Sequence, residues 1–266
     1  MGVEHWAHKE ERMNTNQIAA ALRRRILSGE FAYGSRLPNI RDLAAEYETS
    51  QQTAAAAYAA LAGMGMVKTV RGKGGTTVTA GPPADAHLGT FTPPDLTAAT
   101  AWRPATGTAS GHEETTSVRQ FPAPASMEAW GIPAGTEVVE RTRLRTIDGT
   151  PVQHKTTVMT VDLAGRRPQG YDGVPPMLAP VGAAPADKPA GVRMAEWLGW
   201  DVAHTEAAIT AEPMDGAAAA ALGLQEDVPG FRIVAIAYRS SGETAFVTVT
   251  SAPLHHRVTL TIAEVE

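Results

Sequence analysis

The residues best suited to hydrogen-bond recognition stand in one short run, Ser50-Gln51-Gln52-Thr53, directly before a stretch of alanines. A serine there can cap a helix, because its side-chain oxygen accepts from an amide two or three residues later. A glutamine amide donates and accepts at once, which matches the N6 and N7 edge of adenine. If the helix enters a DNA groove, this run carries its polar contacts. Exposed glutamines often have no function, so that alternative stays open.

The sequence offers little for catalysis or metal binding. It has no cysteine, which excludes disulfides, thiolate zinc sites and a cysteine nucleophile. It has no serine-elbow, phosphate-loop or HExxH motif. His255 and His256 are adjacent, and neighbours on a strand point to opposite faces, so we do not expect them to chelate a metal together. We therefore expect neither a metal nor a cofactor.

Length and charge indicate two domains with different partners. The chain has 266 residues and a net charge of -5. Residues 1–80 carry ten Lys and Arg against seven Asp and Glu, a net +3, which leaves -8 for the rest. This asymmetry indicates that only the first part meets a polyanion. No apolar run approaches the roughly 18 residues of a membrane span, and the first residues lack the apolar core of a secretory signal. We expect a cytoplasmic protein with no membrane partner.

Periodicity in the first 80 residues predicts three helices and then two strands. Asn14 or Thr15 can cap the first helix and Ser50 the third. The third helix has an apolar face at i, i+3, i+4, i+7 spacing, made of Ala54, Ala57, Tyr58 and Leu61. The predicted boundaries are Gly29 for the end of the first helix, residues 40–47 for the second, Gly63 or Gly65 for the end of the third, and 66–70 and 76–80 for the strands.

This order of residues resembles the winged helix-turn-helix of GntR-type bacterial transcription regulators. The spacing of many positions carries the resemblance: Gln17-Ile18-Ala19, Leu22-Arg23, Ile26, Gly29, Gly34, Leu37-Pro38, Arg41, Leu43-Ala44, Ser50, Thr53 and Gly72. So many spaced matches are a stronger signal than any single motif. The resemblance implies a DNA-binding domain whose third helix enters the major groove and whose strands form a wing.

The resemblance also implies which residues contact DNA. Arg41 would contact a phosphate, the first turn of the third helix would contact bases, and the wing tip would reach a phosphate or the minor groove. The predicted DNA-binding residues are Arg41, Ser50, Gln51, Gln52, Thr53, Arg71, Gly72 and Lys73. Each could instead be an ordinary surface group. Arg23, Arg24 and Arg25 point in three directions on a helix, so at most one of them faces DNA.

Three departures from the family pattern bear on specificity. Gln51 and Ala55 stand where arginines are common, and Asn39 stands where a serine is common. A lost arginine removes a bidentate guanine or phosphate contact, whereas glutamine suits adenine. We therefore expect a changed operator and a salt dependence flatter by roughly one unit of slope for each lost charged contact.

The stretch 81–117 is rich in Pro, Gly, Ala and Thr and has little periodicity, so it is interpreted as a linker. The predicted organisation is a DNA-binding domain at 1–80, a linker at 81–117 and a second domain at 118–266. In the second domain, Asp148-Gly149 between two alternating runs is the strongest hairpin signal. Further strands are predicted at 202–212, 230–238, 245–251 and 257–262, with short helices at 126–130, 193–199 and 215–222. An α+β domain follows, with an antiparallel sheet and helices on one side.

The second domain resembles the UTRA effector-binding domain found behind the winged helix in one GntR subfamily. The matching residues are Ala129-x-Gly131-Ile132-x-x-Gly135, Val138, Arg143-x-Arg145, Asp148-Gly149-x-Pro151, Glu206, Ala219-x-x-Leu222, Tyr238 and Gly242. The resemblance implies a fold like that of chorismate lyase, a small-molecule site, a homodimer and DNA affinity tuned by an effector.

In such domains the paired arginines before the Asp-Gly turn commonly hold the anionic end of the effector. The effector residues implied here are Arg143, Arg145, Lys155, Arg257 and Glu206. Lys155 replaces an acidic residue that the family often has, and Arg257-Val258 stand where a tyrosine is frequent. Both departures disfavour a sugar phosphate and favour an organic acid. Alternatively, the arginines form ion pairs with Glu140, Glu206 or Glu212.

We therefore expect a dimeric transcription factor that acts as a repressor, reads a palindromic double-stranded operator and binds a small-molecule effector. Two alternatives stay open. One is an enzyme with a lyase-like second domain, and the other is a protein-interaction module with a degenerate winged helix.

Overall fold

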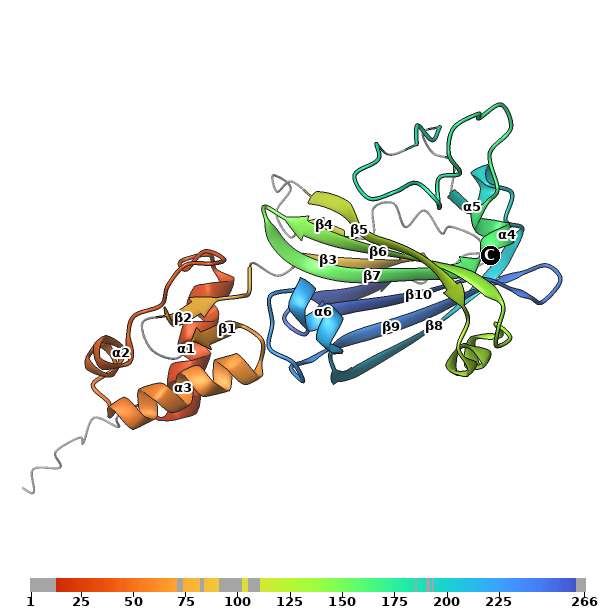
Figure 1. The fold of residues 1–266 in the computed structure, drawn as a ribbon. Helices are drawn as coiled ribbons and strands as arrows, with labels where there is room; N and C mark the ends of the chain where they lie inside the picture. The colour runs from red at the N-terminus through yellow and green to blue at the C-terminus, as the bar shows by residue number, and fades with distance from the viewer. Residues whose placement is uncertain are drawn as a thin grey trace, which may run out of the picture. The chain divides into compact units, whose positions relative to one another are not determined.

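The computed structural model describes residues 13–70, 74–81, 84–90, 102–104, 111–184, 186–189, 192 and 194–261. The chain forms two compact units, Met1–Pro82 and Pro83–Glu266 (Figure 1). Within the described residues, no helix has the length and apolar character needed to cross a membrane. The two units are described separately below.

The first unit has three helices followed by an antiparallel two-stranded sheet. The elements are α1 (Thr15–Leu27), α2 (Ile40–Glu46), α3 (Gln51–Gly63), β1 (Val67–Val70) and β2 (Gly75–Val78). Asn14 caps α1 in a capping box with Gln17, and Ser50 caps α3. The predicted helices and strands are confirmed within two residues at each end. This order is that of a winged helix-turn-helix.

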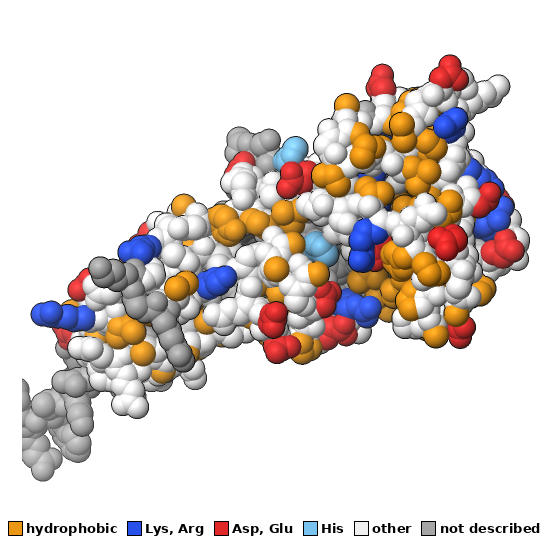
Figure 2. All heavy atoms as spheres, viewed as in Figure 1, with side chains coloured by type: hydrophobic (Ala, Val, Ile, Leu, Met, Phe, Trp, Pro, Cys, Tyr) orange, Lys and Arg blue, Asp and Glu red, His pale blue; other side chains and the backbone are white. Residues whose placement is uncertain are grey.

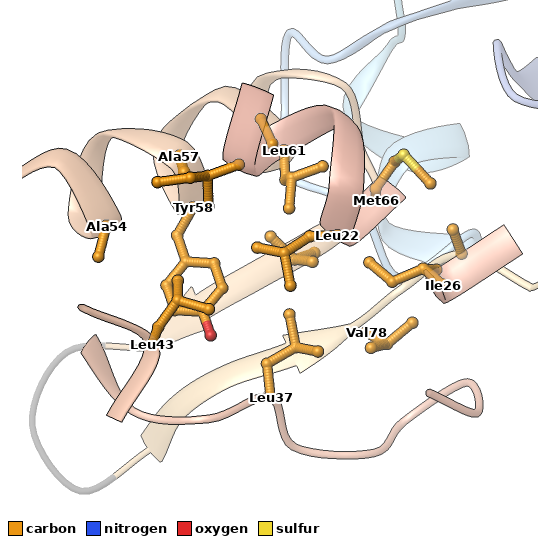
Figure 3. Close-up of a cluster of buried hydrophobic side chains, with 14 of the residues drawn as sticks. Leu22, Ile26, Leu37, Leu43, Ala54, Ala57, Tyr58, Leu61, Met66 and Val78 are labelled. Carbon is orange, nitrogen blue, oxygen red and sulfur yellow. The ribbon is translucent and has the colours of Figure 1, made fainter. Parts of the chain in front are cut away.

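One apolar core holds the three helices and the strands together (Figure 3). Leu22 and Ile26 of α1, Leu43 of α2 and Leu61 of α3 are fully buried. On α3 the predicted apolar face is confirmed, since Ala54, Ala57, Tyr58 and Leu61 are all buried. The core therefore fixes which side of α3 remains exposed.

The main element of the second unit is a six-stranded antiparallel sheet in the order β5-β6-β7-β10-β9-β8. Its strands are β5 (Gly111–Pro122), β6 (Glu137–Ile147), β7 (Thr150–Thr160), β8 (Val202–Pro213), β9 (Pro229–Arg239) and β10 (Thr244–Pro253). The hairpin between β6 and β7 turns at Asp148 and Gly149, which both have positive φ, as a type I′ turn requires. That predicted hairpin is confirmed.

A smaller sheet has the order β11-β3-β4 and includes one parallel pair, β11 with β3. Its strands are β3 (Ala84–Thr90), β4 (Trp102–Pro104) and β11 (Arg257–Thr261). Two of these strands, and the first residues of β5, lie in the stretch 81–117 that we interpreted as a linker. The three-part division of the chain stays a prediction, but the described part of this stretch is mostly strand.

Short helices cover both faces of the large sheet. They are η3 (Ala125–Trp130), α4 (Val161–Ala164), α5 (Met194–Trp197) and α6 (Gly216–Ala221). Val139 packs with Leu163 of α4 and Leu198 just after α5, whereas its neighbour Val138 packs with Met127 of η3. Adjacent strand residues point to opposite faces. The expectation of helices on one side was therefore wrong, and periodicity alone could not reveal which face each helix covers.

Candidate nucleic-acid interface and ligand site

The start of α3 is organised by its cap. Ser50 Oγ accepts a hydrogen bond from the Thr53 amide at 3.0 Å, and the two hydroxyl oxygens lie 2.8 Å apart. Both side chains are thus engaged with each other and with the helix end. They position α3 and its first turn, and Gln51 and Gln52 follow with exposed side chains.

Helix α2 carries the predicted phosphate contact, Arg41, as an exposed residue in its first turn. Asn39, which stands where the family commonly has serine, caps α2 by accepting from the Asp42 amide at 3.0 Å. Asparagine and serine are both good caps, so this departure preserves the start of the helix.

Tyr58 links α3 to the turn before α2. Its hydroxyl donates to the Pro38 carbonyl at 2.6 Å, and burial raises the pKa of the phenol. This bond fixes the rotation of α3 relative to α2, and so the direction in which Gln51 and Gln52 point.

We expect Tyr58→Phe to destabilise the first unit by about 1 kcal/mol, because it leaves the partly buried Pro38 carbonyl without its donor. Hydrogen exchange of the α3 amides in the full chain measures this as a roughly fivefold loss of protection. Leu61→Ala is the comparison, with an expected cost of about 2–5 kcal/mol from the cavity it leaves. Unchanged protection in Tyr58→Phe would show that the bond does not hold α3.

Of the three consecutive arginines, Arg25 has a structural role. Its guanidinium lies 2.7 Å from Glu30 and 2.5 Å from Glu46, and donates to the Tyr47 hydroxyl at 3.2 Å. These bonds raise its pKa above the ordinary value, and its guanidinium also stacks over Phe31. Arg23 and Arg24 are exposed. Arg25 thus ties α1 to α2 and is not available to DNA.

The predicted wing-tip contacts Arg71, Gly72 and Lys73 lie outside the described residues. The strands that flank them pair from Val67 with Val78 to Val70 with Gly75. On the face drawn in Figure 2, basic side chains of the first unit are scattered and do not form a broad patch.

In the second unit, one face of the large sheet carries a row of cations. Arg141, Arg143 and Arg145 alternate along β6, and Lys155 of β7 lies directly opposite Arg143. Directly opposed and alternate residues share a face. We call Arg141, Arg143, Arg145 and Lys155 the cationic row. Along β6 the same face is apolar at Val139, where it joins a buried cluster.

A single acid among the described residues forms ion pairs with the cationic row. Glu113 of β5 lies 3.6 Å from Nη1 of Arg143 and 3.9 Å from Nε of Arg145. Two acids that the sequence suggested as partners of these arginines form ion pairs with other residues instead. Glu140 pairs with Arg119, and Glu212 pairs with Arg232. Glu113 was missed because it lies in the stretch interpreted as linker. Four cations against one carboxylate leave an excess of positive charge.

Arg141 is the buried member of the row. It donates to the Ala179 carbonyl at 2.6 Å and to Thr115 Oγ1 at 2.8 Å, while its buried Nε has no partner among the described residues. Burial, with a further contribution from Arg143, lowers its pKa to about 10. Arg141 thus holds the 177–179 segment against the sheet.

Lys155 is half-buried, and its ammonium has neither a hydrogen bond nor an ion pair among the described residues. Burial lowers its pKa, and the positive charges of Arg143 and Arg145 lower it further, while Glu113 opposes them. Buried polar residues surround it on the same face: Gln153, Thr157 and Thr250. The sequence did not indicate that these three residues belong to the site, because only the register of the strands brings them together.

Two predicted effector residues do not join the cationic row. Glu206 of β8 lies in register with Ile236, Val247 and Val158, and is therefore on the opposite face of the sheet. Its exposed carboxylate lies 3.9 Å from His204. Arg257 is exposed on β11, where its neighbour Val258 packs against the cluster of Val152 and Ala252. The structure brings together only Arg143, Arg145 and Lys155 of the five.

Nowhere in the described ranges do three or more His, Cys, Asp or Glu side chains gather in a way that could hold a metal ion. The rings of His255 and His256 lie 4.0 Å apart, and burial lowers the pKa of His256 to about 2. A ring with so low a pKa is neutral at physiological pH.

Comparison with known proteins gives two family matches. Residues 14–78 match the model of bacterial regulatory proteins of the gntR family, and residues 109–171 match the UTRA domain. An uncharacterized HTH-type transcriptional regulator of Streptomyces coelicolor is 29% identical over 195 residues, which cover 71% of this chain and 69% of that protein.

Two solved structures align along most of the chain. PhnF from Mycobacterium smegmatis is 22% identical, with coverage of 93% of this chain and 99% of that one and a TM-score of 0.49. YydK from Bacillus subtilis, described as a possible transcriptional regulator, is 18% identical, with coverage of 95% and 100% and a TM-score of 0.42. The assignment rests on the family models and on the sequence relative. The chain therefore carries a domain of the gntR regulatory type at residues 14–78 and a UTRA domain at residues 109–171, and it is a DNA-binding transcriptional regulator with an effector-binding domain.

Proposed function

We propose that this regulator is a cytoplasmic homodimer that represses transcription by binding a palindromic operator, and that a small anionic effector tunes its DNA affinity. It acts by binding and not by catalysis. Helix α3 enters the major groove, with Arg41 and the wing tip at phosphates. The observation that carries the effector part is the ammonium of Lys155, which has no hydrogen bond or ion pair within the described part of the chain and lies beside Arg143 and Arg145.

The cationic row is suited to an anion for a simple electrostatic reason. Like charges on one sheet face repel each other, and burial strengthens that repulsion. Glu113 lies near two of the four cations at distances of 3.6 and 3.9 Å, which are long for ion pairs with direct hydrogen bonds. A carboxylate from a ligand would relieve the repulsion and give Lys155 a partner. The proposed effector class is therefore an organic acid.

An effector can change DNA affinity only if it binds one arrangement of the two DNA-binding domains better than the other. The 177–179 segment gives the ligand site a connection to the rest of the domain, because Arg141 of the row holds its carbonyls. An anion that accepts hydrogen bonds from Arg141 competes with the carbonyls of Met177 and Ala179. Ligand binding is thereby coupled to the position of this segment.

A footprinting assay tests the proposed function. The full chain, incubated at low salt with genomic fragments, is expected to protect a two-fold symmetric site. Its two half-sites should lie about one helical turn apart. Addition of the organic acid identified by thermal-shift screening is expected to release that site. Protection of an asymmetric site, or protection that no tested acid changes, would count against the proposal.

An edge strand supports the homodimer. β8 is a 12-residue edge strand with mostly exposed side chains, and it has no lysine and no proline before its last residue. Natural proteins usually protect such edges from pairing with lysine, proline or bulges, and the one register irregularity of β8 lies at its start, between Val202 and His204. If two copies of β8 pair antiparallel about Ala208, His204 lies opposite Glu212, and Glu206 lies opposite Thr210. No like charges are then opposed. We propose this edge as the interface.

Because the chain has no cysteine, this interface can be tested by single-cysteine variants. Ala208→Cys is expected to form an intermolecular disulfide on mild oxidation, since residues at the two-fold axis of paired strands lie within bonding range. Ala183→Cys, in an exposed loop, is the control and is expected to stay unlinked. A chain that is dimeric by sedimentation but does not crosslink at 207, 208 or 209 would place the interface elsewhere.

A further inference from the structure

The exposed side of α3 has an unusual composition for a DNA-reading helix. Opposite the buried face, the helix presents one stripe, which we call the reading stripe: Gln51, Gln52, Ala55, Ala56 and Ala59. These positions lie within about 140° of one another at 100° per residue. The stripe therefore offers two amides and three methyl groups.

The other polar side chains at α3 already make hydrogen bonds within the first unit. The hydroxyls of Ser50 and Thr53 are engaged in the helix cap. The Tyr58 hydroxyl is buried and donates to Pro38. The helix has no basic residue in any turn, so it has no guanidinium or ammonium to direct at a base.

The chemistry of the base edges then determines what the stripe can read. Guanine presents two acceptors, O6 and N7, and the side chains that read them together are Arg and Lys. Adenine presents an acceptor and a donor, which a glutamine amide satisfies in bidentate form, and thymine presents a methyl group that packs against alanine. Two amides and three methyls match A·T pairs and lack the groups for G·C.

We propose that α3 reads A·T base pairs, with Gln51 and Gln52 on adenine and the alanines of the reading stripe on thymine methyl groups. The inference rests on the proposed entry of α3 into the major groove. It specifies the operator class: each half-site has an A·T core at the positions that α3 contacts.

Selection of bound duplexes from a random library by the full chain tests this. The expected result is enrichment of two-fold related A·T cores. Replacing the adenines enriched in the selection by 7-deazaadenine should lower affinity about 5- to 100-fold for each bidentate pair lost. Replacing the thymines by deoxyuridine should lower it about fourfold for each buried methyl. Gln51→Arg should shift the selected base at one position from adenine toward guanine, while Asn16→Ala, an exposed amide on α1, should change nothing.

Enrichment of cores with G·C pairs at the contacted positions would overturn the inference and leave DNA binding intact. The same holds if A·T cores are selected but their affinity is unchanged by 7-deazaadenine and by deoxyuridine. Absence of any enriched sequence would overturn the proposed groove entry and this inference together. The two failures are thus distinguishable in one experiment.

Discussion

Replacing Gln51 and Gln52 together by alanine is expected to lower the affinity for the specific operator by about 30-fold to 25,000-fold, because each bidentate amide-adenine pair contributes roughly 1–3 kcal/mol. The affinity for unrelated DNA should stay the same, since neither amide carries a charge and the salt dependence comes from phosphate contacts. Fluorescence anisotropy with specific and unrelated duplexes at several salt concentrations measures both.

Arg41→Ala is the matched control for this prediction. It should weaken binding to both duplexes and reduce the salt slope by about one unit, as the loss of one phosphate contact requires. Both sites are exposed, so the variants should unfold at the same temperature as the parent. Equal losses on the two duplexes in the double glutamine variant would mean that the amides do not read sequence.

Lys155→Glu is expected to abolish the response to an anionic effector, with a loss of affinity of about 30-fold to several thousand-fold. A new carboxylate on a half-buried cationic face repels the ligand and competes with it for Arg143 and Arg145, and comparable disruptions of desolvated charge pairs cost roughly 2–5 kcal/mol. Isothermal titration calorimetry with the organic acid that gives the largest thermal shift measures the loss.

Lys155→Met separates the charge from the shape at this position. It keeps roughly the length of the side chain and should lower the affinity for the anion less than Lys155→Glu does. Operator binding in the absence of ligand should stay unchanged. An effector that binds both variants as tightly as the parent would show that the cationic row is not its site.

The pH dependence of effector binding follows from the lowered pKa of Lys155. In the free protein this ammonium loses its proton at a lower pH than an ordinary lysine, because it is buried beside arginines. A bound anion favours the charged form. Anion affinity should therefore be highest near neutral pH, where the ligand carboxylate and the ammonium are both charged, and fall as pH rises through the lowered pKa. This alkaline decline should be absent in Lys155→Met. A decline of equal size in both would assign it to another group.

Local signals in the sequence predicted the first unit well. Asn14 and Ser50 cap helices through bonds to residues three positions away, and the helical spacing of Ala54 to Leu61 is a property of one segment. The Asp148-Gly149 turn is equally local, because both residues adopt positive φ with little penalty. These features were correct because they depend on contacts between near neighbours.

The arrangement of the second unit was harder to predict because it depends on strand register. Glu206 and Arg143 share a site or lie on opposite faces according to how β8 pairs with β9, and the register shift near Val202 is not visible in the sequence. Glu113 meets Arg143 and Arg145 only because β5 pairs with β6. A composition rich in Pro and Gly nearby concealed this strand.

The departures from the family pattern acquire a consistent explanation in the structure. Asn39 preserves the α2 cap, while Gln51 and Ala55 leave α3 without positive charge. In the second unit, Lys155 adds to the cationic row where the family often has an acid. The first set of changes bears on which DNA is bound, and the second bears on which ligand is bound.

The central claim is that two copies of α3 occupy related half-sites of one duplex. Sedimentation velocity with the full chain and a labelled, selected operator tests it most directly. The account predicts two chains per duplex, with binding that requires both half-sites and is lost when one is scrambled. A complex with one chain per duplex that tolerates a scrambled half-site, or a chain that binds no duplex at low salt, would contradict it.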